Sequence, residues 1–175
     1  IRAFAAQNLH VLWERQLQEI QDLPLLPIPG NKLLARVAKS NLFLLDGDSG
    51  TPLWEVQVNG DIVHIVADQA LSCVYGYRDL QSSFWKLSGI DLETGDILWN
   101  FPQPVEDQPP ISIGDYIVFC DKRGRPHVVD QKTGEEKYRH DVEGLKLIDV
   151  LEKHLVTLAA GGSRLDVLSL ETGTS

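Results

Sequence analysis

Methionine is absent from this sequence of 175 residues, and no run of 18 apolar residues occurs in it. Without such a run, no segment has the length and apolarity of a transmembrane helix. Basic residues are also few. The 16 lysines and arginines are scattered, with no cluster longer than Lys122-Arg123-Gly124-Arg125, and the formal net charge is −9. This charge balance disfavours nucleic acid or an anionic membrane surface as a partner and indicates an acidic, soluble surface.

Cysteine and histidine patterns typical of metal or redox sites are also lacking. Cys73 and Cys120, the two cysteines, lie far apart in the sequence and form neither a metal-binding pair nor a CxxC motif. We expect buried structural thiols, with a disulfide as the alternative. The histidines do not have the i,i+4 spacing of a metal site, so we expect packing or surface roles for His10, His64, His127, His140 and His154.

Motifs of nucleophilic catalysis and phosphate binding are missing as well. No serine stands in a Gly-x-Ser-x-Gly elbow. The segment Ala159-Ala160-Gly161-Gly162-Ser163 lacks the lysine that follows a phosphate-binding loop, and a tight hairpin is the better interpretation. We therefore predict that the chain is not an enzyme and has no resident cofactor.

What the sequence does contain is a repeat of a short strand, a tight turn and a second strand that ends in an aromatic residue. Its copies occupy residues 3–13, 44–54, 90–99, 128–138 and 167–173, the first degenerate and the last truncated. Leu9 takes the place of the turn glycine in the first copy, and successive turn positions lie 39 to 45 residues apart. A strand-rich repeat of about 40 residues is the signature of a β-propeller, in which each repeat forms one four-stranded blade.

Each recurring position of the repeat has a physical reason. A tight hairpin needs a positive φ, which glycine adopts without steric cost, and an Asp can accept hydrogen bonds from the turn backbone. A large ring wedged between neighbouring sheets removes much apolar area from water. We interpret these residues as structural repeat positions: Trp13, Asp46, Gly50, Trp54, Asp91, Gly95, Trp99, Asp130, Gly134, Tyr138 and Gly173.

The copies resemble the PQQ-like repeat family, whose pattern is Ala-x-Asp-x-x-Thr-Gly-x-x-x-Trp. The resemblance covers nearly the whole chain, with departures such as Asn8-Leu9 in the first turn and Tyr138 in place of a tryptophan. The family contains quinoprotein dehydrogenases and also propellers that bind no quinone, among them an outer-membrane assembly lipoprotein and luminal or extracellular sensor domains. The dehydrogenases hold the quinone beside Ca²⁺ and use an adjacent pair of cysteines, which this sequence lacks. The resemblance thus favours the non-catalytic branch and an extracytoplasmic or luminal location.

We predict an all-β propeller of four-stranded antiparallel blades that holds about four repeat lengths. The expected units are residues 1–22, 23–60, 61–104, 105–143 and 144–175. Because the first residues already belong to a repeat and both terminal units are incomplete, we expect an arc of a larger ring in a longer chain. The ring would be completed by other blades of that chain or, as the alternative, by a second chain.

For function, the sequence favours a non-catalytic scaffold that binds another protein. Aromatic and arginine side chains anchor protein interfaces, and the hairpin of residues 76–83 carries Tyr77 and Arg78 and is followed by Trp85, the one tryptophan outside the repeat position. These three residues are the candidate partner contacts, although they could instead pack between blades. One alternative function is a segment of a PQQ-dependent quinoprotein dehydrogenase, which would need PQQ and calcium. The other is a ligand-sensing propeller domain.

Overall fold

The computed structural model describes residues 1–4, 7, 10–15, 25–67, 72–82, 84–151, 154–159, 162 and 164–169. Every regular element in these residues is a β-strand. The described part of the chain therefore contains no helix capable of crossing a membrane. The all-β class predicted from the sequence is confirmed.

The strands form five antiparallel sheets, and in each sheet the strands follow one another in chain order. The first sheet contains β1 (Arg2–Phe4) and β2 (Val11–Glu14). The second contains β3 (Leu26–Ile28), β4 (Lys32–Val37), β5 (Asn41–Asp46) and β6 (Pro52–Gln57). The third contains β7 (Gly60–Ala67), β8 (Ser72–Asp79), β9 (Trp85–Asp91) and β10 (Ile97–Asn100). The fourth contains β11 (Ile111–Ile113), β12 (Tyr116–Cys120), β13 (Pro126–Asp130) and β14 (Glu136–Arg139). The fifth contains β15 (Leu145–Leu151), β16 (His154–Ala159) and β17 (Leu165–Ser169).

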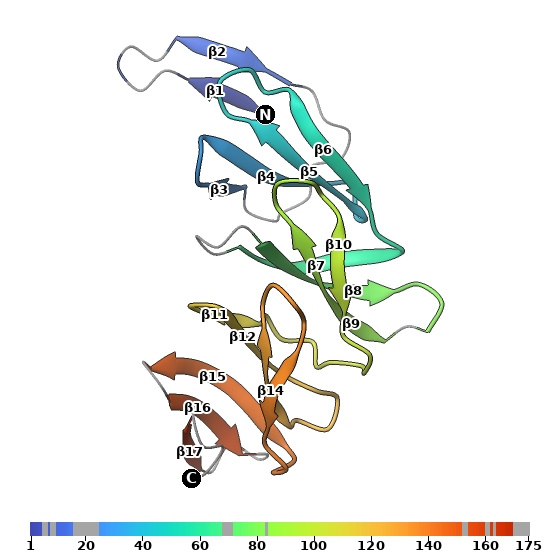
Figure 1. The fold of residues 1–175 in the computed structure, drawn as a ribbon, viewed down its shortest axis with the longest axis vertical. Coiled ribbons are helices and arrows are strands. Elements are labelled where there is room, and N and C mark those ends of the chain that lie inside the picture. Colours follow the sequence, from blue (N-terminus) through green and yellow to red (C-terminus); the bar gives the residue numbers. More distant parts are fainter. Residues whose placement is uncertain are drawn as a thin grey trace.

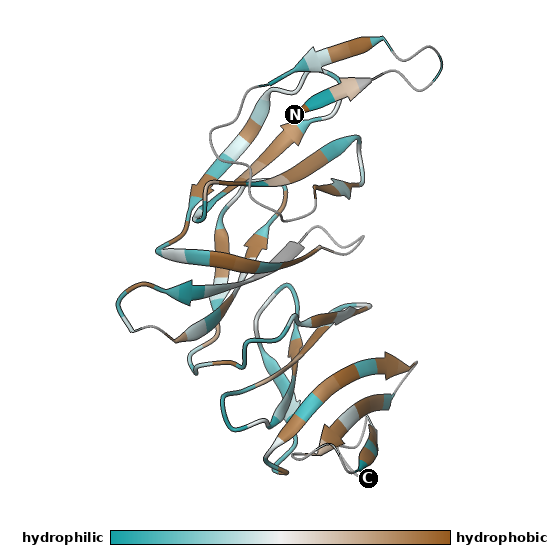
Figure 2. Cartoon of the chain, turned by 180° about the vertical axis from the view of Figure 1, so that it is seen from behind, coloured by the Kyte–Doolittle hydropathy of each residue, from teal (hydrophilic) through white to brown (hydrophobic). Residues whose placement is uncertain are grey.

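The inner strands are apolar on both faces because each middle sheet is covered on both sides. In β5, four consecutive side chains from Leu42 to Leu45 are buried, whereas the outer strand β6 buries little besides Trp54. A strand covered on both faces has a continuous run of apolar residues, whereas a half-exposed strand alternates apolar and polar residues. Figure 2 shows the resulting pattern, with apolar residues concentrated in the strands and polar residues in the hairpins.

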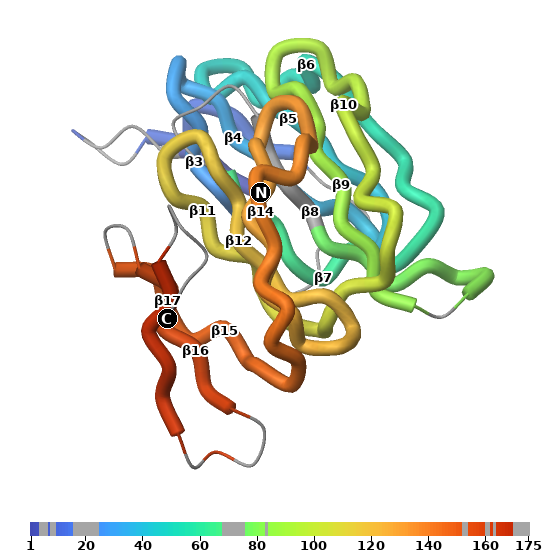
Figure 3. The backbone as a smooth tube through the Cα atoms, turned by 60° about the horizontal axis from the view of Figure 1, so that its bottom comes forward, coloured from blue at the N-terminus to red at the C-terminus, as the bar shows by residue number. Residues whose placement is uncertain are grey.

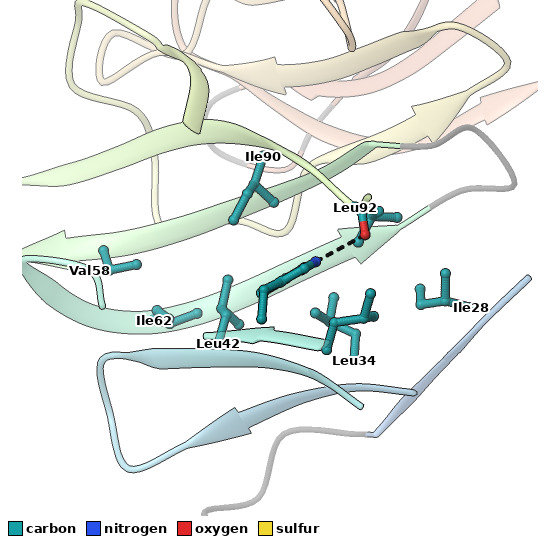
Figure 4. Close-up of a cluster of buried hydrophobic side chains, with 9 residues drawn as sticks. Ile28, Leu34, Leu42, Val58, Ile62, Ile90 and Leu92 are labelled. Carbon is teal, nitrogen blue, oxygen red and sulfur yellow. Dashed lines mark hydrogen bonds between the residues drawn. The ribbon is translucent and has the colours of Figure 1, made fainter. Parts of the chain in front are cut away.

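Successive sheets stack face to face, and a separate apolar cluster lies between each pair. The cluster between the second and third sheets joins Leu34, Leu42 and Trp54 to Ile62 and Ile90 (Figure 4). Equivalent clusters lie on the two sides of the fourth sheet. The sheets follow the chain along the long axis of the molecule, with β1–β2 and β15–β17 at opposite ends (Figure 1). This is the arc of propeller blades that the repeat predicts.

Antiparallel order divides the turns between two edges of the arc. The turns that carry Gly50, Gly95 and Gly134 follow the third strand of each sheet and lie on one side of the molecule, which we call the glycine edge (Figure 3). The hairpins between second and third strands, and the crossings to the next sheet, lie at the opposite, crossing edge. The crossing edge therefore contains residues 80–82, 84, 101–110, 121–125 and 140–144.

Two details of the sequence interpretation were wrong. The three prolines of residues 23–30 predict an extended crossing without a regular ladder, but Leu26–Ile28 pairs with β4 as an edge strand, where Pro27 needs no donor on its open side. The hairpin expected from residue 76 begins only after Asp79, because Tyr77 and Arg78 continue the ladder between β8 and β9.

Candidate functional site

The turns of the glycine edge are held by their aspartates. Oδ1 of Asp46 accepts hydrogen bonds from the Asp48 and Ser49 amides at 3.1 and 2.8 Å, and also from the Ser49 hydroxyl. Asp91 and Asp130 accept bonds from the corresponding turn amides. The glycine that closes each turn has a φ between 67° and 80°. These carboxylates are thus occupied within their own turns.

The repeated aromatic of each sheet contacts the turn of the next sheet. The indole Nε1–H groups donate to the Gly47, Leu92 and Gln131 carbonyl oxygens at 2.8, 3.0 and 2.8 Å, from Trp13, Trp54 and Trp99 respectively. Figure 4 draws the bond to Leu92 as a dashed line. The Tyr138 hydroxyl donates to the Ser169 carbonyl oxygen at 3.3 Å. Each ring therefore links two successive blades.

The same rings lie directly on the turn glycines. A Cβ atom at Gly50 would lie 2.5 Å from the Trp13 ring, one at Gly95 would lie 2.9 Å from the Trp54 ring, and one at Gly134 would overlap the Trp99 ring. The glycine is needed for the positive φ and for the close approach of the ring. Of the repeat positions, Gly173 lies outside the described residues.

Cys120 is buried and free, as expected for a structural thiol, and Cys73 lies in β8 of another sheet. Burial raises the pKa of the Cys120 thiol to about 12. Since the thiolate is the reactive form, a Cys73→Ser variant should react with a thiol reagent at pH 8 at least about 100-fold more slowly when folded than when unfolded. Kinetics with a chromogenic disulfide reagent measure this ratio, and equal rates in the two states would contradict the burial of Cys120.

The structure separates the three residues predicted to contact a partner. Arg78 and Trp85 are directly opposite in the β8–β9 ladder, so their side chains share one face of the third sheet. Arg78 is exposed and Trp85 is half-buried against the cluster beside the fourth sheet. Tyr77 lies on the other face and packs against the cluster beside the second sheet. Trp85 alone of the three lines a pocket at the crossing edge.

The crossing between the third and fourth sheets joins them through its backbone. The Val105 amide donates to the Trp85 carbonyl oxygen, and the Glu106 and Lys122 amides bond to the Cys120 and Pro104 carbonyl oxygens, all at 3.0 Å. Val105 is buried and bridges Trp85 and Asp121. These bonds fix the crossing between the β8–β9 hairpin and the β12–β13 hairpin.

An apolar pocket of about 380 Å³ opens beside this crossing. Phe84, Trp85, Pro104 and Val105 supply its apolar lining, Glu106 and Asp107 add two carboxylates, and Lys122 is shared with the next pocket. The Lys122 ammonium lies 4.1 Å from the centre of the Phe84 ring. This arrangement is a cation–π contact, which holds the lysine at the boundary between the two pockets.

A basic pocket of about 650 Å³ adjoins the apolar one and shares Pro104 and Lys122 with it. Its charged lining consists of Asp121, Lys122, Arg123, Arg125 and Arg139. We call the two pockets together the crossing-edge groove. The basic pocket brings together four cations and one carboxylate, so its lining is positive although the chain as a whole carries a net charge of −9.

A buried carboxylate organises the basic pocket. Asp121 accepts bonds from Nε and Nη2 of Arg125 at 2.8 and 2.5 Å and from the Arg123 and Arg125 amides at 2.9 and 3.0 Å. The ring of His127 lies between Asp121 and Glu136, stacked on Phe119. Burial alone would raise the pKa of the Asp121 carboxyl, but these hydrogen bonds, above all that of Arg125, lower it to about 2.

This network makes stability depend on pH. The folded pKa of Asp121 lies below its ordinary value of 3.8, so the stabilisation is complete above about pH 4 and is lost as the pH falls towards 2. We expect Asp121→Asn to lower the free energy of unfolding by about 2 kcal/mol at pH 7, and the gap to wild type to narrow below pH 4. Urea unfolding of both proteins at pH 7 and at a pH below 4 measures this difference. A difference in the free energy of unfolding that does not change with pH would contradict the prediction.

Several residues in or beside the crossing edge are not singled out by the sequence. Asp79 accepts bonds from the Gln81 and Ser82 amides and from Lys86, with the same Asp-x-x-Ser spacing as Asp46 and Ser49. That spacing could have revealed the turn. In the sequence, Lys122, Arg123 and Arg125 form only a short basic cluster. Arg139 and Pro104 lie far from this cluster along the chain, so no local sequence pattern predicts that all five residues line one pocket.

Comparisons with known proteins agree with this architecture. A family model described as outer membrane protein assembly factor BamB matches residues 1–142. No curated protein is similar in sequence at a significant level. The structure resembles BamB from Moraxella catarrhalis, with 14% identity, a TM-score of 0.58, and coverage of 92% of this chain and 55% of that one. The chain thus spans about half the length of that protein.

Two further solved structures share the fold. The Pan2 WD40 domain of Neurospora crassa has 14% identity and a TM-score of 0.58, with 99% of this chain and 57% of that one covered. The computationally designed Ika4 protein has 15% identity and a TM-score of 0.60, with 90% and 99% covered. At these identities the likeness shows the β-propeller fold alone.

Proposed function

Because this chain belongs to the family of the outer membrane protein assembly factor BamB, we propose that it is a non-catalytic β-propeller scaffold that binds another protein. The observation that carries the proposal is the crossing-edge groove, where half-buried Trp85 and exposed Phe84 adjoin a cluster of arginines. Aromatic and arginine side chains around a partly desolvated pocket are the usual anchors of protein interfaces.

The other prominent side chains support a scaffold more than a catalyst. The repeated aspartates are bonded to their own turns, and the indoles of Trp54 and Trp99 are buried and bonded to the next sheet. Cys73 and Cys120 belong to different sheets, so they do not form the adjacent pair of the quinoprotein dehydrogenases. The family description refers to outer membrane protein assembly, which supports an extracytoplasmic location.

A capture experiment with matched variants tests the scaffold role. Trp85→Ala alters the groove, Arg78→Ala alters the residue opposite Trp85 on the same face of the third sheet, and Tyr116→Ala removes an exposed ring at the glycine edge. With the tagged full-length chain, we expect Trp85→Ala and Arg78→Ala to recover at least about tenfold less of the bound protein than wild type, and Tyr116→Ala to recover the same amount. Circular dichroism controls for folding, and equal recovery by all variants would place the interface elsewhere.

A further inference from the structure

The cations of the crossing-edge groove are not equally neutralised. Arg125 is firmly paired with buried Asp121. By contrast, Arg123 meets Glu143 and Arg139 meets Asp141 through single contacts of 3.4 Å on exposed surface. Such exposed pairs contribute little and are readily exchanged for another carboxylate. Lys122 has no ion pair among the described residues and lies over the Phe84 ring.

Arg125 is preorganised to bind an anion. Its side chain is 17% exposed, and Asp121 fixes the guanidinium through Nε and Nη2 only. No described residue accepts a hydrogen bond from Nη1 of Arg125. A fixed guanidinium with a remaining donor loses little conformational freedom when it binds a carboxylate.

The two pockets of the groove also differ in charge. Arg123, Arg125 and Arg139 line only the basic pocket, whereas Glu106 and Asp107 line only the apolar pocket. Asp107 is 3.3 Å from His64. A ligand that fits this pattern has an apolar part beside an anionic part, with its negative charge directed away from Glu106 and Asp107.

We propose that the crossing-edge groove binds an extended acidic segment of a protein partner, with one large apolar side chain in the apolar pocket and carboxylates against Arg123, Arg125 and Arg139. The two pockets have the combined size of a typical ligand site and share Pro104 and Lys122, so one peptide can span both. This inference rests on the proposed scaffold function and adds the chemistry of the partner.

Short fluorescein-labelled peptides test the proposal directly. The first contains one phenylalanine followed by three Asp or Glu residues in a Gly/Ser background, the second replaces the acids by their amides, and the third replaces phenylalanine by serine. By fluorescence anisotropy at low salt, we expect the first peptide to bind at least about tenfold more tightly than either of the others. Its affinity should fall as salt is added.

Variants locate the binding. The double variant Arg123→Gln/Arg139→Gln should weaken the first peptide by about tenfold, whereas Arg2→Gln, which alters an exposed ion-paired arginine on the first sheet, should leave it unchanged. Equal affinity for acidic and amide peptides, no saturation up to about 1 mM, or equal loss with Arg2→Gln would overturn the proposal. Citrate that competes as tightly as the peptide would also overturn it, in favour of a small anionic ligand.

The outcomes for the two proposals are distinguishable. If the peptides do not discriminate but Trp85→Ala still loses the captured protein, the acidic ligand is wrong and the scaffold role stands. If capture is unaffected by every groove variant, the scaffold proposal itself fails at this surface.

Discussion

Trp99→Ala is expected to lower the free energy of unfolding by about 4 kcal/mol. The side chain is buried in the apolar cluster between the third and fourth sheets, which also contains Phe101 and Phe119, and its Nε1–H bonds to the Gln131 carbonyl oxygen. Truncation removes the apolar contacts, leaves a cavity and deprives a buried carbonyl of its donor. Urea unfolding followed by circular dichroism measures the change.

Two matched variants separate the contributions to this effect. Trp99→Phe keeps an aromatic ring but removes the Nε1–H donor, so it should lower the free energy of unfolding by about 1–2 kcal/mol. Trp85→Ala truncates a tryptophan that is only half-buried, and its cost should be about 1 kcal/mol. If Trp85→Ala and Trp99→Ala were equally destabilising, the repeated ring would not be the link between blades.

Gly134→Ala is expected to lower the free energy of unfolding by about 3 kcal/mol. The residue has a φ of 73°, which strains any L side chain, and its new Cβ would overlap the Trp99 ring. Backbone strain accounts for about 1 kcal/mol and the displaced ring for the remainder. The same urea titration, with tryptophan fluorescence as a second readout, measures the loss.

The same blade offers a control for the strain alone. Gly114 has a φ of 54°, and a Cβ there would meet nothing within 4 Å. Gly114→Ala should therefore cost about 1 kcal/mol. If Gly114→Ala and Gly134→Ala lowered the free energy of unfolding by similar amounts, the positive φ, and not the contact with the Trp99 ring, would be the reason that position 134 needs glycine.

The repeat could be predicted from the sequence because its turn chemistry is local. Asp91, Thr94 and Gly95 lie within five consecutive positions, and the bonds that hold the turn join residues of that same segment. The all-β propeller follows from the period of such turns. The acceptor of each indole is not local, since Trp54 bonds to Leu92 across a sheet boundary.

The groove was only partly predictable for the same reason. Trp85 was identified as exceptional because it falls outside the repeat. Tyr77 is predicted as a contact from its place beside Arg78 in the hairpin, but it packs on the other face, since neighbouring residues of a strand alternate between faces. The meeting of Trp85, Pro104, Lys122 and Arg139 depends on how two sheets stack, and no sequence spacing records that packing.

Site-specific photo-crosslinking tests most directly the claim that partners bind at the crossing edge. Phe84 and Tyr116 are aromatic, 41% and 40% exposed, and lie at opposite edges of the arc. Each is replaced by benzoylphenylalanine in the full-length chain, which is then irradiated in its native compartment. The proposal predicts a discrete crosslinked protein from position 84 and none from position 116. The same adduct from position 116, or an adduct from that position alone, would contradict it.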